Sequence, residues 1–522
     1  MNLYEEHFLL TGRGVDPTAI RPPSAPPRPK KEFLMSNISR RQFFGSTAAV
    51  AAVGLTGAAH AADLCSIPKK WDHTVDVIVV GAGGAGLAAA ITALEKGAKV
   101  AILEKLGMPG GNTMVSGGGM NGAVVEEAKK AGIEDSPKLH TEQTLAAGDF
   151  RADPALVAQY AEKMPETVEW FRKLGVTFTP IYQIYGGLWP RCRNPQGQKG
   201  YAYIEAMLKR LKELKGEVLT GHKVTAFIRE NPSEGRVLGV EVEVKGKKEY
   251  WRATKGVVAS AGGYAYNAEM CAYFDPRLTK LSTTNQPGAT GEVLVAMQDI
   301  GALAIGLDYI QCIPGTAPGY KSKGNLIQVI EYSIFVNKEG KRFVAEDSRR
   351  DVIRDATLAQ TGQTVYPLTD SVGFAADNKF QGETNKKALA DGTLFEAQTL
   401  DELAGKIGVP AAELKKTIAE YNKLVDSKKD PLGRAPRMLA HKIEKAPFYA
   451  GPIGMARHHT MGGVKIDVKA RVLDRHGKVI PGLYAAGEVT GGIHGTNRVG
   501  GNALGDAFTY GRIAGESAAT GA

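Results

Sequence analysis

The chain has 522 residues, of which 43% are hydrophobic and 23% are charged, and its formal net charge is +10. This composition is typical of a globular protein, and the length is sufficient for two domains with a large core. No apolar run reaches the roughly 18–20 residues that span a bilayer, and no basic tract with interleaved aromatic residues suggests nucleic-acid binding. We therefore expect a globular protein with no membrane span and no nucleic-acid partner.

The first 61 residues have the pattern of a leader. Ser39-Arg40-Arg41-Gln42-Phe43-Phe44 is a twin-arginine signal, an apolar stretch follows, and Ala59-His60-Ala61 is a small-x-small cleavage site. This predicts a mature chain that begins at Ala62 and is exported, already folded, to the periplasm. Residues 1–34 are Pro-rich, and an ordinary export signal begins at Met35, so we expect translation to start there.

The next segment has the pattern of a dinucleotide-binding unit: a buried parallel strand, a glycine-rich turn, a helix and a second strand. These parts are Val75–Val80, a G-x-G-x-x-G motif, Leu87–Lys96 and Lys99–Leu103. The motif alone is weak evidence. The parts in this order, with an acidic residue after the second strand, strongly predict a bound dinucleotide.

Each residue of the motif has a physical role. Gly81 permits the tight turn, Gly83 lets the backbone approach a pyrophosphate, and Gly86 lets the helix pack close to the strand. The N-terminus of the helix offers unpaired N–H groups and the positive end of its dipole to the phosphates. Glu104, which stands 23 residues after Gly81, is placed to accept hydrogen bonds from ribose hydroxyls.

Three further segments favour FAD over NAD. A second Gly/Ser/Thr-rich loop, 107–121, follows directly, and a flavin needs such a second backbone cradle for its ring and ribityl chain. The run 256–263 is typical of the strand that crosses the dinucleotide domain, and 482–488 is typical of the strand that closes the site in two-part FAD folds. The C-terminal part of the chain is therefore expected to return to the nucleotide domain.

The sequence pattern changes between these two parts. Residues 314–456 contain a hairpin pattern at 334–343 and helical patterns at 400–406 and 411–427. We therefore predict an α/β fold in which a two-part Rossmann-like FAD-binding domain contains an inserted α+β capping domain. The predicted boundaries are 62–313 for the first FAD part, 314–458 for the cap and 459–522 for the second FAD part.

Two glycine-dense turns near the C-terminus suggest a site for a carboxylate. His458 and His459 stand in the Gly-broken turn RHHTMGG, and Arg498 stands in HGTNRVGG, 40 residues after His458. An imidazole and a planar guanidinium brought together form a clamp for a carboxylate. A lone arginine in a Gly-rich loop is usually a surface residue, so this interpretation depends on backbone that passes close to a flat or charged ligand.

Specific motifs give these parts a family resemblance. They are GGNTMVSGGGMN, TNQPGATGE, FVNKEGKRFVAE with the following RRD, HHTMGGVKID and HGTNRVGGNA. From about Val75 to Ala519 the chain resembles the soluble periplasmic flavoproteins of the fumarate reductase–succinate dehydrogenase superfamily, particularly flavocytochrome c fumarate reductases and urocanate reductases. The resemblance implies one non-covalently bound FAD per chain. It also implies reduction of the C=C bond of an α,β-unsaturated carboxylate that serves as a respiratory electron acceptor.

The resemblance further implies which residues bind FAD. They are Gly81, Gly83, Ala85, Gly86, Glu104, Lys105, Gly111, Asn112, Thr113, Gly118, Gly119, Ala261, Gly262, His459, Gly487, Glu488, Asn502, Ala503 and Leu504. His459 is expected near the pyrimidine edge of the flavin, and a purely structural role is equally compatible with the sequence. Glu488 is expected at the ribityl chain and His494 beneath the ring.

In the reaction that the resemblance implies, a hydride passes from flavin N5 to one alkene carbon and an arginine donates a proton to the other. His458 and Arg498 match the carboxylate clamp, and Arg350 matches the proton donor. Two alternatives remain for this residue: Arg350 forms only an ion pair within the cap, or the adjacent Arg349 is the proton donor instead.

Arginine is an unusual proton donor because a guanidinium is ordinarily always protonated. The role requires a dry site, neighbouring positive groups and a carboxylate relay that returns the proton. Asp351 and Glu331 are the candidates for that relay.

Departures from the family pattern indicate the substrate. Fumarate enzymes hold a second carboxylate with a histidine in a Q-x-H-P turn, and this chain has Ile313 in that place; urocanate reductases use Tyr and Asp where this chain has Cys312 and Ile327. A second buried carboxylate facing Ile313 would be unpaired and costly. We therefore expect an acrylate-type 2-enoate with an apolar or aryl substituent, held in a pocket formed by Ile313, Gln328 and Tyr332.

The electron donor is expected to be a separate protein. The 522 residues contain four cysteines and no C-x-x-C-H motif, so we expect no haem on this chain and a separate c-type cytochrome as donor. The positive charge would suit an acidic cytochrome, and solubility explains it equally well. No metal site is expected. The first alternative function is fumarate or urocanate reduction; a ketone-linked flavin dehydrogenase and a flavin electron carrier agree less well with the clamp and the cap.

Overall fold

In the computed structural model the described residues are 67–521, apart from 185, 233 and 325. The predicted leader, with Met35 and Ala62, lies outside the described residues, and export stays a prediction.

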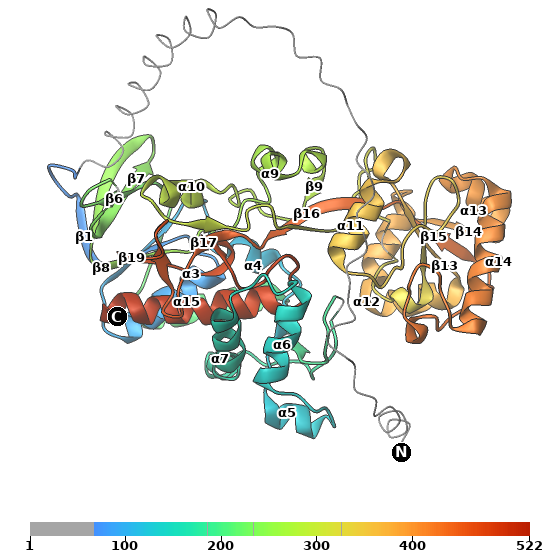
Figure 1. Cartoon of the computed structure of the whole chain (residues 1–522), viewed down its shortest axis with the longest axis horizontal. Coiled ribbons are helices and arrows are strands. Elements are labelled where there is room, and N and C mark those ends of the chain that lie inside the picture. The colour runs from blue at the N-terminus through green and yellow to red at the C-terminus, as the bar shows by residue number, and fades with distance from the viewer. Residues whose placement is uncertain (1–66, 185, 233, 325, 522) are drawn as a thin grey trace, which may run out of the picture. The chain divides into compact units, whose positions relative to one another are not determined.

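The nucleotide-binding part is built on a sheet that takes strands from both ends of the described chain (Figure 1). β1 (His73–Val80) pairs in parallel with β2 (Val100–Glu104) on one side and β8 (Lys247–Ala259) on the other, and β19 (Val479–Ala485) joins the far side of β8. The inner ends of β1 and β2 are buried and rich in Val, Ile and Leu, as expected for parallel strands covered on both faces. The predicted α/β fold is therefore confirmed.

The other elements of this part have the following bounds. The remaining strands of the large sheet are β5 (Val218–Thr220), β6 (His222–Arg229), β7 (Val237–Val244) and β18 (Arg471–Leu473). Short strands elsewhere are β3 (Met120–Asn121), β4 (Cys192–Arg193), β9 (Ser282–Thr283), β10 (Ala304–Ile305), β17 (Gly463–Lys465) and β20 (Thr490–Gly491). The helices are α3 (Gly84–Glu95), α4 (Gly111–Val115), α5 (Val125–Lys130), α6 (Pro137–Ala147), α7 (Pro154–Lys173), α8 (Gly200–Glu213), α9 (Ala268–Phe274), α10 (Glu292–Asp299) and α15 (Asn502–Thr520).

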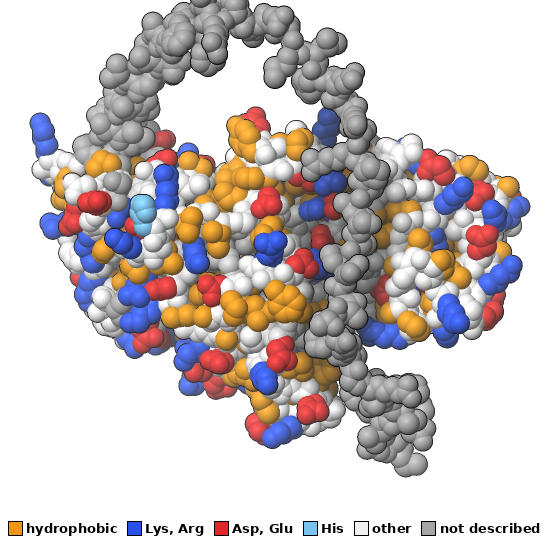
Figure 2. Space-filling view, viewed as in Figure 1, with side chains coloured by type: hydrophobic (Ala, Val, Ile, Leu, Met, Phe, Trp, Pro, Cys, Tyr) orange, Lys and Arg blue, Asp and Glu red, His pale blue; other side chains and the backbone are white. Residues whose placement is uncertain are grey.

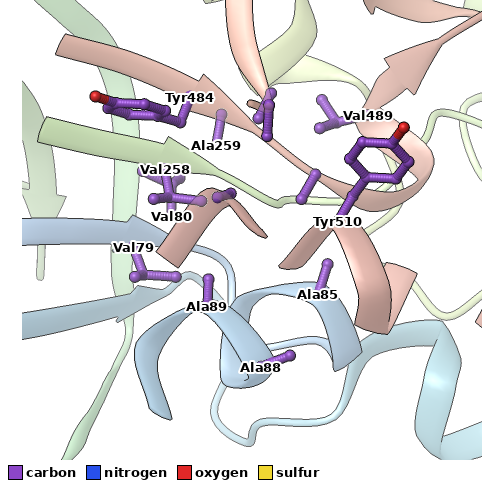
Figure 3. Close-up of a cluster of buried hydrophobic side chains, with 14 of the residues drawn as sticks. Val79, Val80, Ala85, Ala88, Ala89, Val258, Ala259, Tyr484, Val489 and Tyr510 are labelled. Carbon is purple, nitrogen blue, oxygen red and sulfur yellow. The ribbon is translucent and has the colours of Figure 1, made fainter. Parts of the chain in front are cut away.

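Helix α15 lies directly against α3 because both present small residues at their contact. A Cβ on Gly511 would lie only 2.4 Å from the carbonyl oxygen of Ala85, and one on Gly515 only 2.1 Å from that of Ala89. Figure 3 shows Ala85 and Ala89 in the same buried cluster as Tyr510 of α15. This close packing holds α15 against α3, and the start of α15 lies beside the cavity described below.

The segment predicted as a cap has its own sheet and core. Its strands are β12 (Ile334–Val336), β13 (Tyr366–Thr369), β14 (Phe395–Ala397) and β15 (Phe448–Ala450), and its helices are α11 (Arg350–Leu358), α12 (Ser371–Ala390), α13 (Leu400–Ile407) and α14 (Ala411–Ser427). Leu403 and Leu414 from the two last helices pack with Ile334, Leu368 and Ala450 from the sheet. Helices α13 and α14 coincide with the two predicted helical patterns. The predicted hairpin is reduced to one bridge, because β12 pairs with β13 instead.

A ladder of two strands connects this segment to the nucleotide-binding part. β11 (Ile310–Gly315) runs antiparallel to β16 (Gly454–Thr460). The predicted domain boundaries after residues 313 and 458 therefore fall inside paired strands. All described residues lie in one compact unit, so these boundaries stay predictions.

One prediction about this region is wrong. His458 and His459 belong to strand β16 and not to a Gly-broken turn, because the ladder to β11 continues as far as Thr460. The glycines that follow serve a close approach of backbone: a Cβ on Gly462 would lie 1.9 Å from the carbonyl oxygen of Gly306.

Charges of both signs are mixed on the visible surface (Figure 2). Figure 2 shows Lys and Arg side chains interspersed with Asp and Glu on the visible face, so the net positive charge does not form a field of one sign there. Within the described residues, no helix combines the length and the hydropathy needed to cross a bilayer.

Candidate functional site

A cavity of about 540 Å³ opens at the carboxyl ends of the parallel strands. Its walls include Val80 at the end of β1 and Ser260 and Ala486, which directly follow β8 and β19. Open α/β sheets bind their ligands at this edge. The cavity extends from there to Arg350 of α11 and to the histidines of β16.

Most of the predicted site residues line this one cavity. They are Arg350, His458, Arg498, Ile313, Gly81, Gly83, Ala85, Glu104, Lys105, Gly111, Asn112, Thr113, Gly118, Gly119, Ala261, Gly262, His459, Gly487, Glu488, Ala503 and Leu504. Segments up to about 420 positions apart in the sequence thus line one cavity. The predicted FAD-binding residues and the predicted carboxylate clamp lie in the same continuous space.

Four of the residues predicted to bind FAD or to form the substrate pocket lie outside the cavity walls. The Asn502 side chain is fully buried and binds Asn121, His140 and Thr144 instead. The Gln328 backbone N–H donates to Asp377, and the Tyr332 ring packs 5.1 Å from His441. The fourth, Gly86, is considered next.

The glycines of the first turn have the geometry that a dinucleotide requires. Gly81 has a φ of +94°, which favours glycine, and a Cβ on Gly86 would lie 1.9 Å from the carbonyl oxygen of Gly81. At Gly83 no atom lies within 4 Å of a Cβ position, so a ligand can approach the backbone there. The Glu104 carboxylate accepts N–H bonds from Ala82 and Leu106, both at 2.8 Å, and keeps acceptor capacity for a ribose.

A β-bulge turns His458 toward the cavity. In the β11–β16 ladder Gln311 pairs with His459 and the next residue, Cys312, pairs with Arg457, so His458 is the extra residue. Neighbouring side chains in a regular strand point to opposite faces, yet His458 and His459 both line the cavity. Bulges re-aim side chains in this way and occur often beside active sites.

The His458 ring is held by its neighbours and is uncharged. Its Nδ1 lies 2.7 Å from Thr284 Oγ1, and Asn285 Nδ2 donates to its backbone oxygen at 2.9 Å. Burial lowers the pKa of His458 well below the usual range, and the positive charges of Arg498, Arg350 and Lys323 lower it further. A neutral imidazole can accept or donate one hydrogen bond to a bound acid.

A single amide oxygen lies between the two arginines that were predicted to be catalytic. Gln311 Oε1 accepts a bond of 3.0 Å from Arg350 Nη1 and one of 2.8 Å from Arg498 Nη2. Gln311 Nε2 donates to Asn497 and to the Arg498 backbone oxygen, which fixes the orientation of the amide. Because this acceptor is neutral, it holds the guanidinium groups without neutralising their charge.

The local environment makes the charge of Arg498 unfavourable. Burial lowers its pKa to about 9, and the like charge of Arg350 contributes in the same direction. Arg498 Nε is buried and has no hydrogen-bond partner among the described residues. A bound carboxylate would supply the missing negative charge.

The two relay candidates behind Arg350 are not equivalent. Asp351 binds the neighbouring Arg349 at 3.1 and 2.8 Å, and Arg349 in turn binds Asp149. Glu331 lies in a short 3-10 turn, and neither candidate is among the residues that line the cavity. Arg349 is thus committed to two carboxylates, whereas Arg350 lines the cavity, and the relay itself stays a prediction.

A second polar group lies beside the clamp. His459 Nδ1 is 3.5 Å from Glu488 Oε1, and Glu488 accepts a bond of 3.0 Å from Thr460 N. Burial raises the pKa of Glu488 and lowers that of His459. The His494 ring lies 5.7 Å from the His459 ring and binds Asp506 at 3.1 Å. His459 and Glu488 therefore face the cavity, and His494 supports them from behind.

Some residues of the site were missed by sequence reasoning. Gln311, Thr284 and Asn285 stand in family motifs, and that position was their available signal. Lys323 has no such signal. It lines the cavity, and burial lowers its pKa, which the charge of Asp377 only partly offsets.

The residues present fit FAD. The start of α3, with its N–H groups and its open Gly83, suits a pyrophosphate, and the Glu104 carboxylate suits a ribose. At the other end residues 487–488 and 503–504 and the neutral His459 line a space that continues to the clamp. A flavin ring that ended there would lie beside a carboxylate bound by Arg498.

Comparison with known proteins was made on the sequence and on the fold. Residues 76–504 match the FAD binding domain family. The chain is 37% identical to the NADH:acrylate oxidoreductase of Vibrio harveyi over 86% of this chain and 51% of that protein, so it spans about half the length of this relative. It is 38% identical to the fumarate reductase (cytochrome) of Shewanella frigidimarina over 88% of this chain and 79% of that protein.

The fold has a solved counterpart. The structure of the open conformation of a flavocytochrome c3 fumarate reductase superposes with a TM-score of 0.73 and 31% sequence identity, and it covers 94% of this chain and 83% of that one. The similarity therefore extends through the nucleotide-binding part and the segment that carries Arg350.

Proposed function

The chain belongs to the FAD binding domain family, among the fumarate reductase-like flavoproteins, and from this premise we propose that it reduces the C=C bond of an α,β-unsaturated carboxylate. The observation that carries the proposal is the pair of arginines on Gln311. Two guanidinium groups and a neutral histidine line one cavity, and the amide between the arginines carries no charge of its own. An anionic substrate is the ligand that this arrangement suits.

We propose that one FAD is bound non-covalently per chain, by the residues that line the cavity between Gly81 and Leu504. Bound FAD supplies the hydride for one alkene carbon. The residues of the chain bind the acid and provide the proton.

Arg498 and His458 hold the carboxylate in this proposal. The negative charge that develops on the carboxylate side during reduction is stabilised by the guanidinium, which is already fixed by Gln311 before the reaction. Neutral His458 gives a directional hydrogen bond without a further charge. Arg498 thus acts both in binding and in the transition state.

Arg350 donates the proton in this proposal. Its Nη1 is fixed by Gln311, and the nearby positive charge of Arg498 makes loss of a proton less unfavourable than in water. The Cβ position of Gly186 lies 3.0 Å from the Arg350 guanidinium, so a side chain at residue 186 would press against the donor. Glycine at residue 186 therefore leaves room for the guanidinium on that side.

The substrate we propose is an acrylate-type 2-enoate with an apolar or aryl substituent. Ile313 and Ile184 line the cavity with the arginines and would contact such a substituent. The names of the two relatives, one for acrylate and one for fumarate, support the reaction class. Fumarate or urocanate is the alternative, and Lys323 on the same cavity is the feature that favours a more polar acid.

We further propose a respiratory role in the periplasm with a separate c-type cytochrome as donor. The twin-arginine pattern supports export. The fumarate reductase relative is named as a cytochrome enzyme, whereas the 522 residues here contain no C-x-x-C-H motif. Electron transfer from another protein is consistent with both facts.

The proposal is tested by anaerobic reoxidation of the photoreduced holoenzyme. Methacrylate, crotonate, cinnamate, fumarate and urocanate are added in turn, and the return of oxidised flavin absorbance is recorded. We expect an apolar-substituted acrylate to react fastest. Reoxidation by none of the five acids would contradict the proposal, and fastest reaction with fumarate or urocanate would replace the proposed substrate by the alternative.

A further inference from the structure

The turn that contains Asp149 is bound by two segments of the chain, and each of them carries one arginine of the proposed site. Asp149 and Phe150 follow α6, and both have a φ of +54°, a conformation that is uncommon for residues other than glycine. The Asp149 carboxylate receives two bonds from Arg349, at 2.6 and 2.9 Å, and one from the Thr496 hydroxyl. One carboxylate therefore joins two segments of the chain.

These two segments carry the two arginines. Arg349 directly precedes Arg350, the first residue of α11, and Thr496 stands two residues before Arg498. The backbone repeats the connection: Thr496 N donates to the Gly148 oxygen at 3.2 Å, and a Cβ on Gly495 would lie 2.2 Å from that oxygen. The turn at Gly148–Asp149 is thus packed against the Arg498 loop with no free space.

The ion pair is too exposed to be explained by stability alone. The side chains of Arg349 and Asp149 are 36% and 48% exposed, and exposed ion pairs contribute little to folding. The hydrogen bonds from Arg349, its largest influence, help to lower the pKa of Asp149 to about 2, so the carboxylate is ionised across the neutral range. The two parallel bonds between Arg349 and Asp149 contribute little to the free energy of unfolding, but their fixed geometry can hold the two segments in one relative position.

We infer that Asp149 is a positioning residue, which fixes the start of α11, and with it the Arg350 guanidinium, relative to the loop that carries Arg498. The inference rests on the proposed function, because it assigns importance to the distance between proton donor and clamp. Gln311 binds both guanidinium groups, but it also donates to the Arg498 backbone oxygen at 3.0 Å, and the backbone bond from Thr496 to Gly148 does not need the Asp149 carboxylate. Loss of Asp149 should therefore displace the proton donor more than the clamp.

The same helix offers a matched control. Near the other end of α11, Asp355 accepts a bond of 2.9 Å from Arg277, and both side chains are 48% exposed. This pair also ties α11 to the nucleotide-binding part. It lies away from Arg350, so it tests whether any ion pair on α11 has the same effect.

The test compares Asp149→Asn with Asp355→Asn in the FAD-loaded enzyme. Asn tolerates positive φ and keeps the size of Asp, so the variant removes mainly the charge. With the fastest of the five acids named above, Asp149→Asn should lower kcat between about 10- and 100-fold. The dissociation constant of that acid from the oxidised enzyme, read from the flavin absorbance, should change less than about threefold. Asp355→Asn should change neither value by more than about threefold.

A double-mutant cycle gives the second measurement. Arg349→Gln should lower kcat to the same extent as Asp149→Asn, and the double variant should be no slower than either, because both changes break one contact. Equal losses in the Asp149 and Asp355 variants, additive losses in the cycle, or loss of bound FAD and of folding in both Asp149→Asn and Arg349→Gln would overturn the inference. A wild-type enzyme that no acid reoxidises would contradict the proposed function first, which distinguishes the two failures.

Discussion

Arg350 and Arg498 donate hydrogen bonds to the same oxygen, Gln311 Oε1, at 3.0 and 2.8 Å. Two like charges are thereby held side by side in a buried cavity by a group that carries no charge. A carboxylate at Gln311 would neutralise the arginines and weaken their attraction for an acid. The neutral amide preserves that attraction, and this property underlies the first two predictions.

Replacement of Arg498 by alanine should impair both binding and turnover. The guanidinium meets the carboxylate in the ground state and in the transition state, so we expect KM to rise, kcat to fall, and kcat/KM to lose about 2–4 kcal/mol of transition-state stabilisation. Steady-state kinetics with an equal FAD content in both proteins measures this. Unchanged kcat/KM would remove Arg498 from the site.

Replacement of Arg350 by lysine should separate proton donation from binding. Lysine keeps the charge but loses the planar fork and reaches a different point. We expect kcat to fall by at least about 100-fold, since general acid catalysis contributes this much, while the acid still binds to the oxidised enzyme. Arg354→Lys on the same helix is the control and should keep most of the activity. Rapid reoxidation of reduced Arg350→Lys enzyme would assign the proton to another group.

Replacement of Ile313 by histidine should shift the preference toward fumarate. The new imidazole would offer a partner to a second carboxylate, and the ratio of kcat/KM for fumarate to that for crotonate should rise about tenfold, the value of one charge-assisted hydrogen bond. Ile313→Leu keeps the apolar character and serves as control. A wild-type enzyme that already prefers fumarate would show that the apolar-pocket argument is incorrect.

The stability of the protein should fall as the pH falls below about 6.5, the usual pKa of histidine. Burial lowers the pKa of His140 to about 3, and the charge of Arg191 assists, so the folded protein leaves this ring uncharged while the unfolded chain takes up a proton. Between the pKa of the folded state and that of the unfolded state, each such histidine should lower the free energy of unfolding by up to about 1.4 kcal/mol for each unit by which the pH falls. Above the pKa of the unfolded state it should have no effect.

This expectation is checked by urea unfolding at about pH 5 and pH 7.5. His140→Gln can keep the donor to Asn502 Oδ1, which lies 3.1 Å from His140 Nε2, and removes the titration. The variant should lose less stability than the wild type between the two pH values, and an identical loss in both proteins would exclude His140 as a source of the dependence.

The contact between α15 and α3 should tolerate no added methyl group. Because a Cβ on Gly515 would lie 2.1 Å from the Ala89 oxygen, Gly515→Ala should destabilise the protein by about 1–3 kcal/mol. At Gly405 of α13 no atom lies within 4 Å of a Cβ position, so Gly405→Ala should stabilise the helix by about 0.5–1 kcal/mol. Thermal unfolding of the two variants would show whether the signs differ as expected.

The sequence predicted the parts of this protein that follow from local pattern. The strand, the glycine turn and the helix after Val75 have a fixed spacing with a physical reason for each residue, and α14 coincides with its predicted range because its apolar period is regular. Arg498 and His458 could be proposed because they stand beside conspicuous Gly-rich motifs, and Arg350 could be proposed because the RRD motif matches the proton donor of the family that the chain resembles.

The contacts that hold these residues could not be predicted in the same way. Gln311 is a neutral amide, and nothing in its type shows that two arginines share its oxygen. The positive φ of Asp149 could not be predicted from the local sequence, and Lys323 stands in no motif. Asn502 was assigned to the cofactor with its neighbours, but its side chain is used by a network that depends on the packing of α6 against α15.

Because of the bulge at His458, the proposed site depends on the number of residues in β16 as well as on their identity. Both histidines line the cavity only because β16 has one residue more than the strand beside it. Deletion of Arg457 or His459 would leave a histidine in the sequence and restore a regular ladder, in which two neighbouring side chains can no longer share a face. Sequence comparison that scores residue identity alone would still find the motif in such a variant, although the clamp would have lost its geometry.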